Sequence, residues 1–287
     1  MIAVIGGSGK IGSPIIRNLA KNRMAARALT SNPKSADRLQ TLGATEVVIG
    51  DFRKDDDVRR AVQGCTSIFH VVPPFCEDEV EIGYRVIRIA REAGVEHIVF
   101  NSVLHPQIRR MTHHARKLLV EEAVIESGLP FTIVQPAILM QNIQDVWEKI
   151  LTEGTYPVFS SPQKKMRMID AEDLGEAIAK VLTDPGLRGA TYEMAGPEAL
   201  TFTEMAAIIS EELHRSVQVI LLDEKARESF ARTQGWKDYA SEAFKKMWDH
   251  YDKYGSPGGN PLVLTSILGR SPTDYRSFVK RMIAGNE

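Results

Sequence analysis

The sequence predicts an α/β fold in which helices cover both faces of a parallel sheet. Apolar runs of strand length alternate with amphipathic segments through the first half of the chain, and such an alternation is typical of strands joined by right-handed crossovers. The runs are continuously apolar, as expected of strands that are buried on both faces. They read IAVIG, AARALT, ATEVVIG, TSIFHVV, EHIVFNS and FTIVQP, and the amphipathic segments lie near 10–22, 33–42, 54–63, 77–94 and 110–127.

The alternation loosens after about residue 136. DAED at 170–173 and TFTE at 201–204 are typical helix caps, and SPTD at 271–274 would place Pro272 at a first helical position. These signals predict a mostly helical cap, with a few strands, over the carboxyl ends of the sheet. We expect a first domain over 1–136, with returning segments near 156–195, and a cap over 137–287.

Length and composition exclude several classes of protein. The 287 residues suffice for one large domain, or for a domain with a smaller cap. The net charge of −1 indicates no excess of basic residues that would bind nucleic acid. No run of apolar residues approaches the ~18 that a transmembrane helix needs. The opening strand MIAVIGG leaves no room for a signal peptide, and the two cysteines, Cys65 and Cys76, fit a reducing compartment. We expect a cytoplasmic protein that binds neither nucleic acid nor membranes and holds no metal.

The strongest chemical signal lies between the first strand and the first helix. It consists of Gly6, Gly7, Ser8, Gly9, Lys10, Ile11 and Gly12. Glycines let the backbone turn tightly against a pyrophosphate, and the helix N-terminus offers N–H groups and a positive dipole end. The stretch predicts a dinucleotide site in a doubly wound sheet of the Rossmann type; a tight turn without a ligand is the alternative. A nucleoside-triphosphate loop is excluded, because Ile11 follows Lys10 where Ser or Thr is required.

The end of the second strand indicates which dinucleotide is bound. Chains selective for NAD usually carry an acidic residue there, which binds the ribose hydroxyls. This chain instead has Thr30, Ser31 and Asn32, with Lys34 close by. Ser31 and Lys34 are candidates for binding a 2′-phosphate, although Lys34 and the neighbouring arginines could also be solvated charges at a helix start. NADP(H) is favoured, and NAD(H) is possible.

Longer strings carry more specific information than the glycines. They are GGSGKIG at 6–12, GDF at 50–52, FHVVPP at 69–74, AGVEHIVFNSVLHP at 93–106, HHARKLLVEE at 113–122 and SGLPFTIVQPAILMQN at 127–142. Together they resemble the NmrA-like family of the atypical short-chain dehydrogenase/reductase superfamily. The resemblance is dense over roughly the first half of the chain and looser in the tail.

The resemblance implies a cofactor groove along the carboxyl ends of the strands, where open α/β sheets bind their ligands. The implied positions are Asp51 and Phe52 beside the adenine, Val72, Pro73 and Pro74 along the sugar and phosphates, and Gln135 and Pro136 around the nicotinamide. From the sequence alone, Asp51 could equally cap a turn or a helix.

The chain departs from the superfamily pattern at the reductase centre. Active members combine a serine with a tyrosine and a lysine spaced Y-x-x-x-K, in which the lysine holds the nicotinamide ribose and the tyrosine is the acid. Ser102 matches the serine and Lys117 the lysine, but His113 stands in place of the tyrosine. A histidine near a cation tends to stay neutral, and neutral imidazole is a poor acid. The stretch RRMTHHARK could also be a solvated basic helix face.

Three functions remain open. The first is an NAD(P)H-dependent reductase of quinone-like or conjugated small molecules, which need no strong acid at the site. The second is a non-enzymatic NAD(P) sensor that acts through a regulatory protein partner. The third, a sugar-nucleotide epimerase, is disfavoured by the missing tyrosine. An aromatic stripe over 235–255 is either core, a subunit interface of a possible homodimer, or the wall of a substrate pocket.

Overall fold

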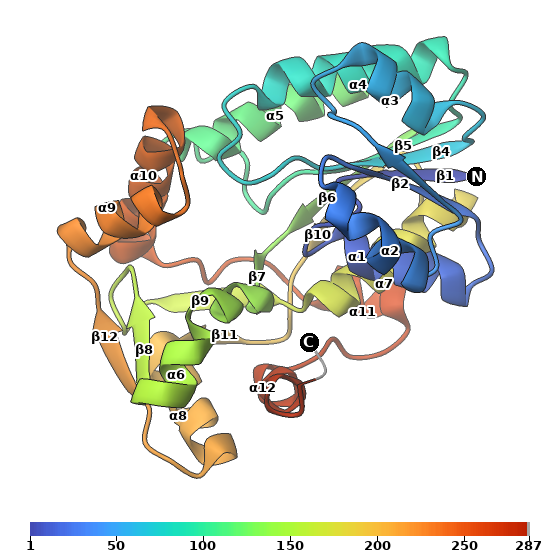
Figure 1. Ribbon diagram of the computed structural model, residues 1–287. Helices are drawn as coiled ribbons and strands as arrows, with labels where there is room; N and C mark the ends of the chain where they lie inside the picture. The colour runs from blue at the N-terminus through green and yellow to red at the C-terminus, as the bar shows by residue number, and fades with distance from the viewer. Residues whose placement is uncertain (286–287) are drawn as a thin grey trace.

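The computed structural model describes residues 1–285 and contains a seven-stranded parallel sheet that lies between helices (Figure 1). The sheet runs in the order β10-β6-β5-β4-β1-β2-β3, and every neighbouring pair is parallel. Its strands are β1 (Ile2–Ile5), β2 (Ala26–Thr30), β3 (Glu46–Ile49), β4 (Ser67–His70), β5 (His97–Asn101), β6 (Phe131–Pro136) and β10 (Ala190–Met194). The strand order reverses between β1 and β4, and such a switch point opens a crevice at the carboxyl ends of the strands. The predicted α/β class is confirmed.

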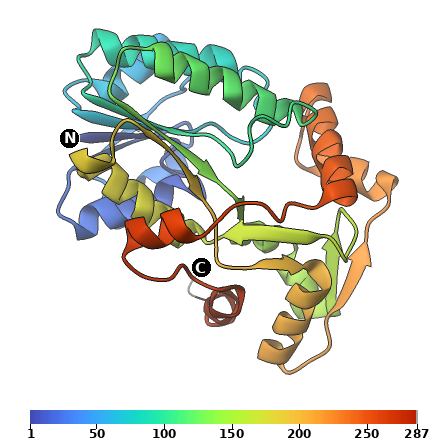
Figure 2. The same cartoon turned by 180° about the vertical axis from the view of Figure 1, so that it is seen from behind.

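Helices cover both faces of this sheet (Figures 1 and 2). One face carries α1 (Gly12–Lys21), α2 (Ala36–Thr41), α7 (Ala171–Thr183) and α11 (Leu262–Leu268), and the other carries α3 (Asp55–Val62), α4 (Glu79–Glu92) and α5 (Thr112–Glu126). The expected apolar face of α1 is buried through Ile15, Ile16 and Leu19. Burial on both faces explains why the strands read as continuous apolar runs.

The second half of the chain builds two smaller sheets and a separate core. β7 (Ile138–Leu139), β9 (Lys165–Ile169) and β11 (Ala199–Thr201) form one sheet, and β8 (Thr155–Val158) pairs with β12 (Gln218–Leu221). The helices around them are α6 (Trp147–Glu153), α8 (Phe202–Leu213), α9 (Glu224–Thr233), α10 (Asp238–Tyr254) and α12 (Tyr275–Ile283). Of the segments expected to return to the main sheet, α7 and β10 do so, whereas β8 and β9 lie in the smaller sheets.

Short 3-10 turns complete the described chain: η1 (Pro33–Ser35), η2 (Met140–Val146) and η3 (Pro185–Leu187). Two predicted helix caps are present. Asp170 accepts a hydrogen bond from the Glu172 N–H, and Thr201 forms a capping box with Glu204. The prediction for Pro272 is wrong, because the Asp274 carboxylate caps α12 and the helix begins at Tyr275. Within residues 1–285, no helix has both the length and the apolar character needed to cross a bilayer.

Candidate active site

The glycine-rich loop joins β1 to α1 beside the switch point of the sheet, and its glycines are there for different reasons. A Cβ on Gly12 would lie 2.3 Å from the Gly6 carbonyl oxygen, and one on Gly7 would lie 2.9 Å from the Ala28 Cβ. Gly6 adopts a φ of +82°, which favours glycine. Gly9 is exposed, and a Cβ there would meet its nearest neighbour only at 3.4 Å. Packing therefore requires Gly7 and Gly12, whereas Gly9 is exposed and has room for a Cβ.

Polar contacts hold the loop against its surroundings. The Ser8 hydroxyl lies 2.9 Å from the Thr30 hydroxyl at the end of β2, and the Arg38 guanidinium on α2 donates to the Ser8 carbonyl at 2.8 Å. On the opposite side, the Lys10 ammonium reaches the Asp145 carboxylate at 3.2 Å. Ile11 packs against the core below α1. The loop thus bridges the main sheet and the η2 segment of the second half.

No carboxylate follows β2 directly. Ser31 and Lys34 are both exposed, and Asn32 accepts from the Lys34 N–H to begin η1. Arg27, by contrast, pairs with Glu46 near the start of the strand. Arg38 is the basic side chain of α2 that contacts the glycine loop, and it is one of the arginines near Lys34 that could have been solvated charges.

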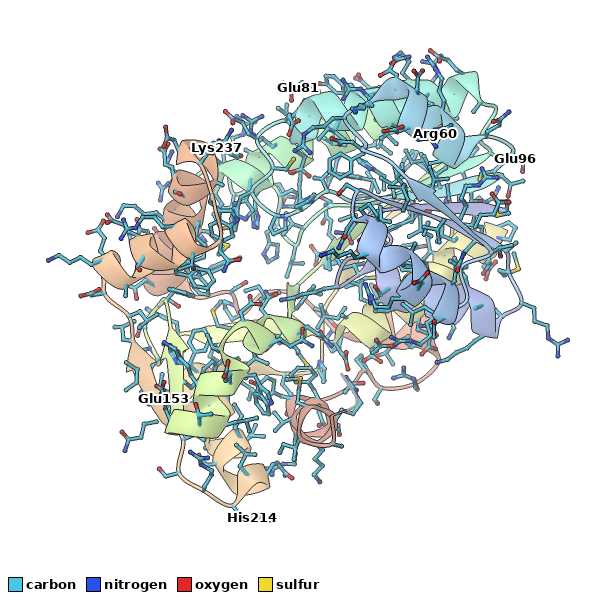
Figure 3. The ribbon with its side chains drawn as sticks, viewed as in Figure 1. Arg60, Glu81, Glu96, Glu153, His214 and Lys237 are labelled. Atoms are coloured by element: carbon cyan, nitrogen blue, oxygen red, sulfur yellow. The ribbon has the colours of Figure 1, made fainter. Side chains whose placement is uncertain are left out.

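The positions implied for the adenine and the sugars follow β3 and β4. One carboxylate oxygen of Asp51 accepts from the Arg53 N–H at 2.9 Å, so Asp51 closes a turn, and the Arg53 guanidinium lies 5.0 Å from the centre of the Phe52 ring. After β4, Val72 is buried, whereas Pro73 and Pro74 are exposed. All of these residues lie at carboxyl ends of strands. Those ends face α10, near Lys237, and lie opposite Glu96 at the amino end of β5 (Figure 3).

Lys117 takes part in a buried ion pair. Its ammonium donates to the Glu79 carboxylate at 2.5 Å, and the Glu79 side chain is 1% exposed. The ammonium also contacts the Asn101 carbonyl oxygen, at 3.4 Å. Burial raises the pKa of the Glu79 carboxyl, although Lys117 opposes this effect. The pair ties α5 to the first turn of α4, and Glu79 was not among the predicted site residues.

His113 and His114 are buried at the start of α5. The His113 ring lies 4.9 Å from the Phe75 ring and 4.5 Å from the His114 ring. Burial, together with the charges of His114 and Lys117, lowers the pKa of His113 to about 2. His114 donates through Nδ1 to the His105 carbonyl oxygen at 3.1 Å, and burial lowers its pKa to about 4. Both imidazoles are therefore neutral near pH 7.

A buried carboxylate joins the ends of β5 and β6. The Gln135 amide donates to both oxygens of Glu121, at 2.8 and 3.1 Å. Burial raises the pKa of Glu121, against the opposing effects of Ser102, Gln135 and Lys117. Pro136, also buried, ends β6. Sequence reasoning missed Glu121, although its i+4 spacing from Lys117 places both on one face of α5.

The aromatic stripe packs inside the chain. Its members are Trp236, Tyr239, Ala243, Phe244, Met247 and Trp248 on and before α10, and they cluster with Phe75, Phe159 and Phe230. Phe75 connects this cluster to the site, because its ring lies 5.2 Å from Trp236 and contacts His113 on the other side. The stripe therefore packs between α10 and the segment after β4, with Ala243 and Phe244 buried and its other four members half-buried.

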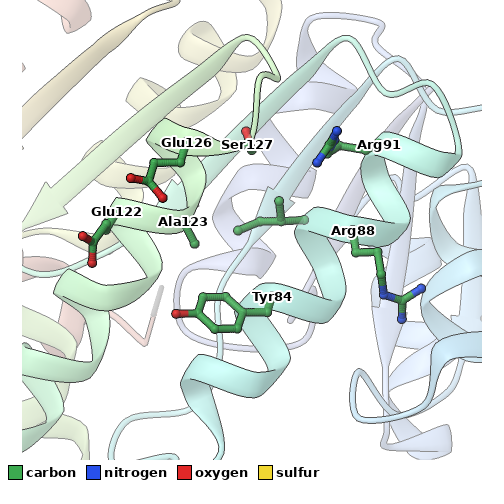
Figure 4. A pocket seen from close by; sticks show the side chains of 8 residues that line it. Tyr84, Arg88, Arg91, Glu122, Ala123, Glu126 and Ser127 are labelled. Carbon is green, nitrogen blue, oxygen red and sulfur yellow. The ribbon is translucent and has the colours of Figure 1, made fainter.

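A separate groove lies between the second halves of α4 and α5 (Figure 4). Arg88 and Arg91 line it from α4, and Glu122 and Glu126 from α5. None of the predicted site residues lines this groove. The candidate site therefore lies at the other ends of these helices, near the carboxyl ends of the strands.

Together, the sheet order and the glycine loop are those of a doubly wound α/β protein, a class that typically binds dinucleotides at this switch point. The chain belongs to the NmrA-like family, whose model matches residues 1–272. It is 28% identical to the NAD(P)H azoreductase of Xenophilus azovorans over 86% of both chains, and 25% identical to quinone oxidoreductase 2 of Escherichia coli over the full length of both.

Solved structures share the fold. The NADPH complex of the Escherichia coli quinone oxidoreductase matches with a TM-score of 0.84 at 23% identity, covering 99% of this chain and all of the other. NmrA, a negative transcriptional regulator solved with NADP, matches with a TM-score of 0.77 at 19% identity, covering 100% of this chain and 96% of the other. The relatives thus include both NAD(P)H-dependent oxidoreductases and a regulator.

Proposed function

We propose that this protein is an NAD(P)H-dependent reductase that transfers hydride to quinone-like or other conjugated small molecules. The cofactor would supply the hydride when bound. Gly9 and the N-terminus of α1 receive the pyrophosphate, and the carboxyl ends of β5 and β6, with Ser102 and Gln135, flank the reacting end. The azoreductase and quinone oxidoreductase relatives support this class of acceptor.

The observation that carries the proposal is the state of His113. It stands where an acid is required for carbonyl reduction, yet it is buried against Phe75 and its pKa is lowered to about 2. It is therefore a neutral imidazole at neutral pH, and the remaining N–H of a neutral imidazole is a poor acid. Hydride addition to a simple ketone leaves an alkoxide, which needs a positioned acid. Addition to a quinone leaves a delocalised phenolate, which takes its proton from water.

The test is NADPH oxidation measured across matched acceptors. We expect quinones and conjugated carbonyls to be reduced at least a hundredfold faster than simple ketones, since a positioned acid typically contributes ~10²–10⁴ in rate. Gly9→Asp provides the control, because it should abolish turnover of every acceptor. Equal rates on ketones and quinones would contradict the proposal.

The cofactor of this reductase is NADPH in preference to NADH. The end of β2 offers Ser31 and Lys34 without a carboxylate, and the Arg38 guanidinium already lies on the glycine loop. Arg38→Met should lower NADPH affinity at least tenfold, ~1.4 kcal/mol, and leave NADH affinity nearly unchanged. Titration calorimetry with NADPH and NADH measures both affinities. The same titrations on Lys34→Met show how much of the preference for NADPH depends on Lys34 and how much on Arg38. Equal losses for NADPH and NADH would assign Arg38 to loop stability instead.

An NAD(P) sensor is the second candidate. It is favoured by the ion pair between Lys117 and Glu79, because Lys117 occupies the position of the lysine that binds the nicotinamide ribose in active reductases. A sensor would bind NADPH and show no oxidation with any acceptor of the panel. The same assay therefore separates the two functions.

A further inference from the structure

β12 forms one edge of the two-stranded sheet in the second half of the molecule. Its one neighbour within residues 1–285 is β8, which runs parallel to it. Both views place β12 at the margin of the molecule, with β8 on its inner side (Figures 1 and 2). Such a pair is unusual, because parallel strands normally belong to larger sheets that are covered on both faces. The outer edge of β12 has no strand beside it.

The backbone of β12 divides its hydrogen-bonding groups between the two sides of the strand. The N–H of Gln218 donates to the Gly154 carbonyl oxygen at 2.9 Å, and the N–H of Leu222 donates to the last residue of β8 at 2.8 Å. Successive residues of a strand direct their N–H and C=O groups to opposite sides. The backbone groups of Val219 and Leu221 therefore point away from β8, toward the open edge.

The two outer edges of this small sheet differ. On β8, the residue after Pro157 bonds to β12, so Pro157 itself faces the other way and offers no N–H to a further strand. Proline is one of the features that protect natural edge strands from pairing. β12 has neither a proline nor a charged side chain, and its Ile220 and Leu221 are 42% and 50% exposed. The edge of β12 is thus apolar and open to pairing.

The charges at the two ends of β12 have opposite signs. Arg215 precedes the strand and Asp223 follows it, both are exposed, and neither forms an ion pair among the residues that the structure describes. Each lies four residues from Val219. An antiparallel copy of the strand centred on Val219 therefore brings Arg215 of each chain opposite Asp223 of the other. Centring on Ile220 would instead bring Arg215 toward Lys225, a second cation.

We propose that the outer edge of β12 pairs with the same edge of a second copy of this chain, which joins two small sheets into one about a twofold axis. Backbone hydrogen bonds at Val219 and Leu221 hold the two strands together, as in other cases of strand addition. The two pairs of Arg215 with Asp223 select the antiparallel register. This homodimer needs neither cofactor nor hydride transfer, so it goes beyond the proposed reductase function.

Sedimentation velocity on the full chain measures the dimer and its dissociation constant. Arg215→Glu places carboxylates opposite each other at both ends of the interface, and Asp223→Lys places cations opposite each other. We expect each variant to raise the dissociation constant at least tenfold, ~1.4 kcal/mol. An equimolar mixture of the two variants should restore the dimer, because each chain then supplies the charge that the other lacks. Arg232→Glu, at an exposed position of α9, is the control and should leave the dimer unchanged.

A wild-type chain that is monomeric at every concentration would overturn the proposal. So would a dimer that neither variant weakens, or a mixture that associates no more tightly than the separate variants. Asp223 also caps α9, but a damaged helix cannot explain a dimer that returns on mixing. If Asp223→Lys does not fold, Leu221→Pro takes its place, since it removes an N–H that β8 does not use. A Leu221→Pro dimer as tight as that of the wild type would equally overturn the proposal.

Discussion

Different glycines of the loop after β1 serve different purposes: some are required for packing, and others leave room for a ligand. Gly12 packs its Cα against the loop backbone, whereas Gly9 faces open space. Both positions fit one motif in the sequence, and the sequence cannot say which glycine serves packing and which serves a ligand. That distinction depends on neighbours such as Ala28, which lie far along the chain.

We predict that Gly9→Asp abolishes NADPH binding while changing stability little, because its carboxylate would occupy and repel the pyrophosphate site. Gly12→Ala should instead destabilise the fold by about 1–3 kcal/mol, the usual cost of overpacking. Calorimetry and urea unfolding of both variants measure the two effects. Unchanged NADPH affinity in Gly9→Asp would remove the cofactor from this loop.

The same distinction applies to the charges. The resemblance to the superfamily implied Ser102 and Lys117 as site residues. It did not imply Glu79 and Glu121, because neither belongs to the superfamily motif. Glu79 meets Lys117 only when α4 and α5 pack together, and Glu121 meets Gln135 only through the neighbouring β6. Local patterns predict which helix carries a charge, whereas its partner depends on tertiary packing.

Among whole elements, the sequence predicted the alternating first half well, because long periodic segments are unambiguous. A few strands were expected in the second half, but their pairing into two smaller sheets was not predicted, since β7 and β11 are too short to show a period. The helix start predicted at Pro272 was wrong because a proline is a weaker signal for a helix start than a capping side chain. The Asp274 side chain caps α12.

The stripe on α10 allows a prediction for an element. Phe244 is buried among Phe75, Phe159 and Trp236. Phe244→Ala should lower the free energy of unfolding by about 3–5 kcal/mol, as usual for a core phenylalanine. Tyr254→Ala, at an exposed position of the same helix, serves as the control and should cost far less. A small loss in Phe244→Ala accompanied by a change in oligomeric state would instead make the stripe a subunit interface.

For the whole molecule, buried histidines link stability to pH. Burial lowers the pKa of His70 to about 3 and of His97 to about 4, in addition to the shifts of His113 and His114. The unfolded chain protonates each of these histidines below about pH 6.5. The folded chain does not protonate them until their lowered pKa values are reached. Because the unfolded state binds more protons in this window, stability falls as the pH drops below about 6.5.

Carboxylates contribute to the pH dependence of stability in two opposite ways. Asp78 and Glu176 have lowered pKa values, so their contributions are lost only below about pH 4. Glu79 and Glu121 have raised pKa values and act in the opposite sense, because the folded state takes up their protons first. They offset part of the histidine effect as the pH falls through their folded values.

His70 is the histidine that tests this account. It lies in β4 with its ring 5.8 Å from the Phe100 ring, and neither of its nitrogens has a hydrogen-bond partner in the part of the chain that the structure describes. His70→Phe keeps the ring and removes the proton site. Each histidine contributes up to ~1.4 kcal/mol per pH unit below pH 6.5. Urea unfolding between pH 7 and 5 should therefore show a shallower loss in the variant, by about that amount per unit, and a higher stability at pH 5 than the wild type. Parallel curves for the two proteins would mean that His70 is protonated in the folded state as readily as in the unfolded one.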